Sequence, residues 1–171
     1  MSDYKRLYVK GGCYFFTVVT WQRQKLFASS EAVSLLRQAC KIVMLRKPFV
    51  LEAMVLLPDH LHCIMRLPVD DHDYSGRWRE IKKYVSRRIR DTDTNSRARV
   101  WQSRFWEHLI RDDNDWRRHM DYIHYNPVKH GYVSVPLDWP HSSLRKYVDV
   151  GMYPADWGAA VSDDLRKMHI E

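Results

Sequence analysis

The sequence contains few cysteines, and the three that it has form no close pair. Cys13, Cys40 and Cys63 are widely spaced, without a CxxC motif, which excludes a disulfide framework and a zinc ribbon and favours a reducing compartment. The sequence also lacks repeats, low-complexity tracts, an apolar segment behind the N-terminus and any apolar run near the ~20 residues that span a bilayer. We therefore expect a cytoplasmic protein that is not bound to a membrane.

The hydrophobic patterns that are present predict an α+β domain. Runs of β-branched, aromatic and other apolar residues predict strands at 7–20, 49–57, 61–67 and 104–110. Helical spacing and capping residues predict helices near 29–46, 76–90, 112–126 and 142–148, with Pro127 ending the third. This order predicts a ferredoxin-like antiparallel sheet with helices on one face and the other face free for a ligand. We expect one domain over residues 1–137 and a tail, 138–171, packed on or near it.

Basic charge is concentrated in one segment of the chain. Between Ser75 and Arg104, ten Lys or Arg residues stand against three Asp or Glu, and this excess of +7 equals the net charge of the whole chain. Such a stretch is typical of proteins that bind a phosphate backbone, although a solvated helix face is the alternative interpretation. The candidate DNA-binding residues are Arg77, Arg79, Lys82, Lys83, Arg87, Arg88, Arg104 and Lys129.

His60 and His62 form the first candidate site. They flank one residue of a predicted strand, so both imidazoles point to the same face and can share a metal ion, whereas Cys63 points to the other face and into the core. With nine histidines in 171 residues, roughly half an HxH pair is expected by chance. The pair alone therefore leaves a metal site and a chance match both open.

Tyr122 forms the second candidate site, on the third predicted helix. The apolar stripe of that helix consists of Trp116, Met120, Ile123 and Pro127. Tyr122 lies roughly 130° from the centre of this stripe, on a polar face with Asp115, His119, Asn126 and Lys129. Because Asn126 follows by one helical turn, a phenol and an amide oxygen can meet the same phosphate. A half-buried structural tyrosine is the alternative. Tyr125 is a rival nucleophile, but its neighbour one turn on is Lys129, which cannot ligate a metal.

Together these motifs resemble a known family. The HLH triplet at 60–62, followed by YIHYN at 122–126, resembles the single-tyrosine transposases of the HUH superfamily. More closely, the segments PDHLHCI at 58–64, RFWEH at 104–108, DYIHYNPVKHG at 121–131 and DWP at 138–140 are similar to REP-associated tyrosine transposases, named after repetitive extragenic palindromes. The resemblance covers almost the whole chain.

The resemblance implies a chemistry for these residues. It implies metal-assisted cleavage of single-stranded DNA by Tyr122, which leaves a 5′-phosphotyrosine link and a free 3′-hydroxyl and needs no nucleotide cofactor. A phenol with a pKa of about 10 is a poor nucleophile at neutral pH, so a cation that polarises the phosphate is needed. The implied ligands are His60, His62 and Asn126, although related insertion-sequence enzymes usually carry glutamine at the last position. The implied metal is Mg or Mn, while this donor set also suits Zn or Ni.

The resemblance also implies the partner, a folded single strand such as a REP hairpin, and action as a monomer, with a dimer as the alternative. His119 and Glu107 are candidates for supporting the metal ligands. Two other functions remain open: a nucleic-acid-binding regulator without catalysis, and a metal-dependent nuclease that uses water in place of Tyr122.

Overall fold

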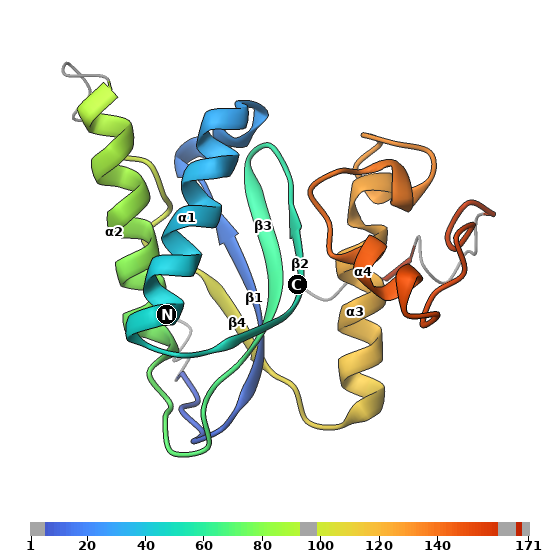
Figure 1. The fold of residues 1–171 in the computed structure, drawn as a ribbon, viewed down its shortest axis with the longest axis horizontal. Helices are drawn as coiled ribbons and strands as arrows, with labels where there is room; N and C mark the ends of the chain where they lie inside the picture. Colours follow the sequence, from blue (N-terminus) through green and yellow to red (C-terminus); the bar gives the residue numbers. More distant parts are fainter. Residues whose placement is uncertain (1–5, 93–98, 161–166, 169–171) are drawn as a thin grey trace.

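The computed structural model describes residues 6–92, 99–160 and 167–168. Four of its strands form one antiparallel sheet in the order β2-β3-β1-β4 (Figure 1). The strands are β1 (Cys13–Val19), β2 (Val50–Leu56), β3 (His60–Arg66) and β4 (Trp106–Leu109). With α1 (Ser30–Arg46) and α2 (Tyr74–Thr92) they follow the β-α-β-β-α-β order of a ferredoxin-like fold, which confirms the predicted fold class.

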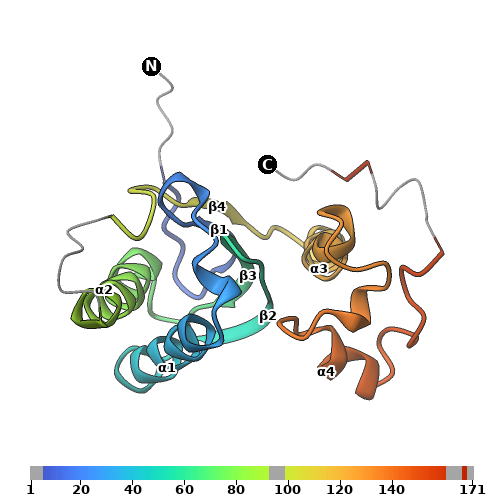
Figure 2. The ribbon, with the colours of Figure 1, turned by 90° about the horizontal axis from the view of Figure 1, so that it is seen from above.

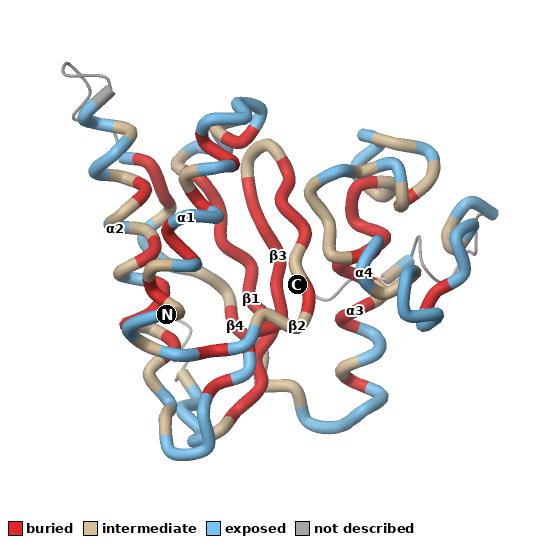
Figure 3. Tube along the Cα trace, viewed as in Figure 1, coloured by how far each residue is buried: buried red, intermediate tan, exposed pale blue. Residues whose placement is uncertain are grey.

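Helices α1 and α2 cover one face of the sheet (Figure 2). Helix α1 begins where predicted, because the hydroxyl of Ser29 accepts a hydrogen bond from the Ala32 N–H at 3.3 Å. Helix α2 buries Trp78, Ile81 and Val85, three residues of its predicted apolar stripe. The two central strands, β1 and β3, are buried over most of their length (Figure 3). Apolar side chains on both faces of the sheet thus hold the domain together.

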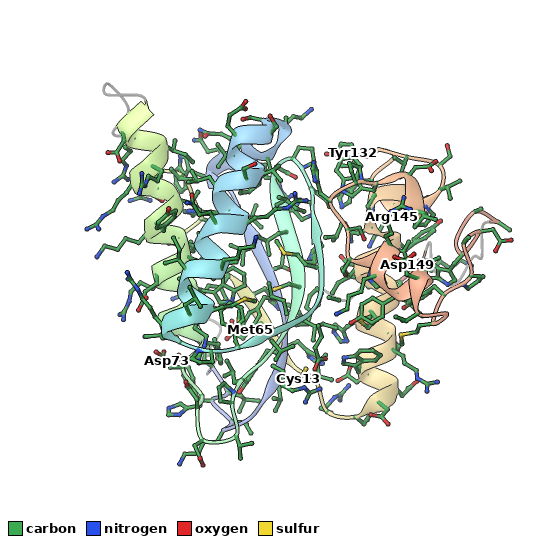
Figure 4. The ribbon with its side chains drawn as sticks, viewed as in Figure 1. Cys13, Met65, Asp73, Tyr132, Arg145 and Asp149 are labelled. Atoms are coloured by element: carbon green, nitrogen blue, oxygen red, sulfur yellow. The ribbon has the colours of Figure 1, made fainter. Side chains whose placement is uncertain are left out.

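Helix α3 (Asp113–Lys129) packs on the opposite face of the sheet. The second apolar core combines its Met120, Tyr122 and Ile123 with Phe15, Val55 and Ile64 of the strands. Met65 and Cys13, both labelled in Figure 4, belong to the cores on the two different faces. The expectation that this second face is free was therefore wrong. Alternating strand residues are apolar on both faces, so each face needs a cover.

Helix α3 also ends later than predicted. Pro127 lies inside its last turn, and the helix continues to Lys129. A proline removes one backbone donor, but near a helix end this loss affects only one hydrogen bond. The following His130 N–H still donates to the Asn126 carbonyl at 3.0 Å, so the turn closes.

The C-terminal segment covers the β2 edge of the sheet and the outer side of α3. The Leu56 N–H donates to His141 O at 2.8 Å, and the Ser143 N–H donates to Met54 O at 2.8 Å. The 3-10 helix η3 (Pro136–Asp138) and the short helix α4 (Leu144–Asp149) follow α3 in this segment. In the described part of the chain, no helix has the length and apolar character needed to cross a membrane.

Candidate active site

His60 and His62 lie side by side on β3 and face α3. In the sheet they stand opposite Val19 and Thr17 of β1. Both are buried, and their ring centroids are 4.9 Å apart. Cys63 directly follows His62 on β3 and points to the opposite face of the sheet. It belongs to the core under α1 and α2, as predicted. Strand pleating therefore gives the two imidazoles the shared face that a common metal ion requires.

Hydrogen bonds fix the orientation of both imidazoles. Nδ1 of His60 donates to the Asp59 carboxylate at 2.6 Å, and Nδ1 of His62 is hydrogen-bonded to the Thr17 hydroxyl at 2.9 Å. Both contacts use Nδ1, so Nε2 is the atom of each ring suited to a metal. Burial, reinforced by the charge of His60, holds the pKa of His62 well below its usual range, which keeps this ring neutral. A neutral, oriented imidazole is the form that ligates metals.

Tyr122 of α3 meets this histidine pair. Its ring centroid lies 5.2 Å from that of His62 with the planes at 69°, and 5.9 Å from that of Phe15. The residue is only 7% exposed. Lys129, two turns further along α3, places its Nζ 4.7 Å from the centre of the Tyr122 ring and donates a hydrogen bond to Met168 O at 2.9 Å. A phenol, an imidazole pair and a cation thus share one site.

Asn126, one turn after Tyr122, has an environment that fits a metal ligand. It is fully buried, and neither polar atom of its side-chain amide has a hydrogen-bond partner among the described residues. A buried amide without a partner is costly, so such a group needs an explanation, and a bound ion is one. Two imidazoles and one amide oxygen form a donor set suited to a divalent cation. The residues present therefore fit the implied metal.

The chain is similar to known proteins over most of its length. The family model described as "Transposase IS200 like" matches residues 9–109. The chain is also 45% identical to a REP-associated tyrosine transposase of Escherichia coli K12, over 95% of this chain and 94% of that protein.

The chain belongs to the IS200-like transposase family. A similarly named protein of Haemophilus influenzae is 44% identical over 92% of this chain and 94% of its own length. A solved structure of a REP-associated tyrosine transposase bound to a REP hairpin superposes with a TM-score of 0.82, at 45% identity, over 95% of this chain and 94% of that one. The predicted resemblance is confirmed, and the protein is a transposase. The family match includes both histidines but ends before α3, which carries Tyr122 and Asn126.

In this transposase the rival tyrosine lies in a different environment. Tyr125 is 3% exposed and contacts the tail through the Trp157 ring, with centroids 6.3 Å apart. Tyr122 instead contacts His62. At 100° per residue, the three-residue step leaves the two side chains roughly 60° apart around the helix axis, so one ring contacts the sheet and the other contacts the tail.

The two residues expected to support the metal ligands differ in their placement. Glu107 stands opposite Phe16 on β1, so it points to the face of α1 and α2, where Arg6 Nε lies 3.6 Å from its carboxylate. The prediction for Glu107 is therefore wrong, because side chains alternate along β4. His119 donates from Nδ1 to Asp115 O at 2.7 Å and packs against Phe15, with ring centroids 4.9 Å apart. It adjoins the site through Phe15, and its described hydrogen bonds go to Asp115.

Of the predicted DNA-binding residues of the transposase, Arg77 is the one that the structure contradicts. It is fully buried, and its guanidinium donates to Asp71 at 2.7 Å and to the carbonyls of Pro48 and Asp73 at 2.6 and 2.9 Å. A side chain without exposed surface cannot contact DNA. Arg77 instead ties α2 to the loops around it.

The other basic residues differ in exposure. Lys82 is partly buried and donates to Gln102 O at 2.7 Å, and burial lowers its pKa to about 8. The exposed members of the predicted set are Arg79, Lys83, Arg87, Arg88 and Arg104. Four of these lie on α2, on the opposite side of the sheet from α3 and Tyr122 (Figure 2). The basic surface and the site thus occupy different faces of the domain.

Two further residues of the site, Asp59 and Thr17, were not predicted from the sequence. Asp59 directly precedes His60 in the PDHLH segment, and this proximity to a candidate ligand was an available signal. Thr17 has no such signal, because only the pairing of β1 with β3 brings it to His62.

Proposed function

We propose that this transposase cleaves and rejoins single-stranded DNA with Tyr122 as the nucleophile. The phenolic oxygen attacks the phosphorus, the bond from phosphorus to the 3′ oxygen breaks, and the phenolic proton is transferred so that the strand leaves as a 3′-hydroxyl. The 5′-phosphotyrosine preserves the energy of the phosphodiester, so a second 3′-hydroxyl reverses the step without a nucleotide cofactor. The observation that carries the proposal is the contact between the Tyr122 and His62 rings, 5.2 Å between centroids.

The charges around Tyr122 support this role. His60, His62 and Asn126 would hold a divalent cation, Mg or Mn, which supplies polarisation of the phosphate and neutralises charge developing on it. Asp59 and Thr17 orient the two imidazoles through their Nδ1 atoms. Lys129 lies over the Tyr122 ring, so its positive charge favours the phenolate that must form during attack.

For the substrate we propose a REP-type hairpin with a single-stranded flank. The related transposase solved with a REP hairpin supports this choice. The exposed arginines and lysine of α2 provide a surface for phosphates. The ring contact between Tyr122 and His62 is made within one chain, which supports action as a monomer.

The test is a denaturing gel of the protein incubated with a labelled hairpin oligonucleotide and Mn²⁺ or Mg²⁺. We expect a covalent adduct that is absent in Tyr122→Phe and in the presence of EDTA. Tyr125→Phe is the matched control, since it removes the same hydroxyl from the other buried tyrosine of α3, and it should retain the adduct.

The other outcomes identify the alternatives. Cleavage that survives in Tyr122→Phe would indicate hydrolysis by water. Salt-sensitive binding without cleavage, across hairpins with varied flanks, would indicate a regulator and would contradict the proposal.

A further inference from the structure

Trp106 lies on the face of the sheet that α3 covers, in the same cross-strand row of residues as His62. The sheet register aligns Val55, His62, Thr17 and Trp106 in one row across the four strands. Trp106 therefore lies two strands from His62, about 10 Å at the usual strand spacing. At ~3.4 Å per nucleotide in a stacked strand, this corresponds to about three nucleotides.

The indole of Trp106 is held in a stack of parallel rings. Its plane lies 4° from that of His108, with centroids 5.9 Å apart, and His108 stacks on His119 at 4.6 Å and 17°. The edge contact with Phe15, at 5.7 Å and 72°, fixes the indole from the side. Asp115 anchors His108 by accepting a hydrogen bond from its Nε2 at 2.9 Å. The ring is thus oriented before any ligand arrives.

Trp106 also keeps solvent exposure where its neighbours in the row are buried. Thr17 and His62 are 4% and 2% exposed, whereas Trp106 is half-buried. It lies on β4, an edge strand beyond which no described strand pairs, and it lines a cavity of about 340 Å³ along that edge. The opposite edge, β2, is covered by the tail. An oriented, accessible indole in a small cavity suits a flat aromatic ligand.

The charges nearby indicate which flat ligand fits. Arg104, exposed and two residues before Trp106, offers a cation for a phosphate. The exposed basic residues of α2 and the site at Tyr122 lie on opposite faces of the sheet (Figure 2), and β4 is the edge along which no described strand pairs. A DNA strand that runs around the β4 edge from the basic residues of α2 to the site at Tyr122 passes Trp106. Alternating cations and aromatic rings are how single-stranded nucleic acid is bound.

We propose that Trp106 is a stacking platform for one nucleobase of the single strand, within about three nucleotides of the phosphate that Tyr122 attacks. This inference rests on the proposed function. The base stacks on the indole and Arg104 contacts the adjacent phosphate, which places the scissile phosphate at the histidine pair. Because every base has a π face, the subsite sets the register of the strand rather than its sequence.

The test uses the Tyr122→Phe protein, so that binding is measured without cleavage. Hairpin oligonucleotides carry the fluorescent base 2-aminopurine at one flank position at a time, and stacking on an aromatic ring quenches its emission. We expect quenching at one or two adjacent positions. Adding Trp106→Leu should abolish this quenching and weaken binding about 5- to 150-fold, whereas Trp106→Phe should retain most of both.

Trp157→Leu is the matched control, because Trp157 is another half-buried tryptophan. It lies in the tail and contacts Tyr125 of α3 and Tyr153. It should leave quenching and affinity unchanged. Equal quenching and affinity with and without Trp106→Leu would overturn the inference. If Trp106→Leu does not fold, photo-cross-linking of a 5-bromouracil base at the quenched position decides: a cross-link to Trp106 supports the subsite, and one to another residue overturns it.

A parallel gel with the protein that retains Tyr122 separates the two proposals. If the protein that retains Tyr122 forms the adduct and Trp106→Leu leaves the quenching unaltered, the stacking platform is contradicted and the tyrosine chemistry is not. Loss of quenching in Trp106→Leu without any adduct in the parent protein contradicts the tyrosine chemistry and leaves the base subsite standing.

Discussion

Replacing Asn126 by alanine should separate the stability of the metal-free protein from its response to metal. The buried amide has no partner among the described residues, and such a group costs about 1–3 kcal/mol. Alanine removes that cost and improves helix propensity by up to about 0.7 kcal/mol, against a small cavity penalty. We expect the metal-free variant to be about 1 kcal/mol more stable, a rise in Tm of about 2–4 °C for a chain of this size.

The metal response should change in the opposite direction. At a Mn²⁺ concentration about 100 times Kd, binding stabilises the native protein by about 2.7 kcal/mol. If loss of the Asn126 ligand weakens binding about 100-fold, the same concentration adds only about 0.4 kcal/mol. Thermal unfolding in EDTA and in Mn²⁺ measures both effects. Asn114→Ala, at an exposed asparagine on the same helix, is the control: it gains at most the helix-propensity contribution and should leave the Mn²⁺ shift unchanged. A metal-free Asn126→Ala protein that is less stable and keeps the full Mn²⁺ shift would refute the reasoning.

Four further predictions concern charged side chains. Arg77→Gln should lower the free energy of unfolding by about 1–3 kcal/mol, because it removes the fully buried guanidinium that donates to the partly exposed Asp71 and to two backbone carbonyls, without changing the DNA affinity of folded protein in titrations. Exposed Arg87→Gln should instead weaken DNA binding and reduce the slope of log K against log salt by about 1, with stability unchanged. The hydrogen bond from Arg77 lowers the pKa of Asp71 to about 2. Above pH ~4, urea unfolding should therefore show that wild type is more stable than Asp71→Asn. This difference in stability should disappear as the pH falls through about 2. Asp59→Asn should weaken Mn²⁺ binding about 10- to 100-fold by calorimetry, because it releases His60.

Local sequence patterns predicted most of the secondary structure because they depend on near neighbours. The Ser29 cap, the apolar stripe of α2 and the alternation around His60 and His62 each appear in the structure as expected. The boundaries were less exact: β1 spans Cys13–Val19 within the predicted 7–20, because Gly11 adopts a φ of +66° in the turn before it.

The site was predicted in part for the same reason. HLH spacing on a strand and the step from Tyr122 to Asn126 on a helix are local geometry, so both pairs were visible without tertiary structure. Spacing along the helix did not show how far the polar face of α3 is buried. It is buried because the sheet covers the side of Tyr122 while the tail covers the side of Tyr125.

The sequence by itself determined the fold class, the family and which residues carry the candidate chemistry, since these depend on periodicity and short motifs. Only the tertiary structure decided which face each residue occupies. Strand pairing brings Thr17 to His62 and aligns Trp106 with them, and packing of α2 buries Arg77 among Asp71 and backbone carbonyls. These outcomes depend on contacts between residues far apart in the chain, so composition and spacing carry no information about them.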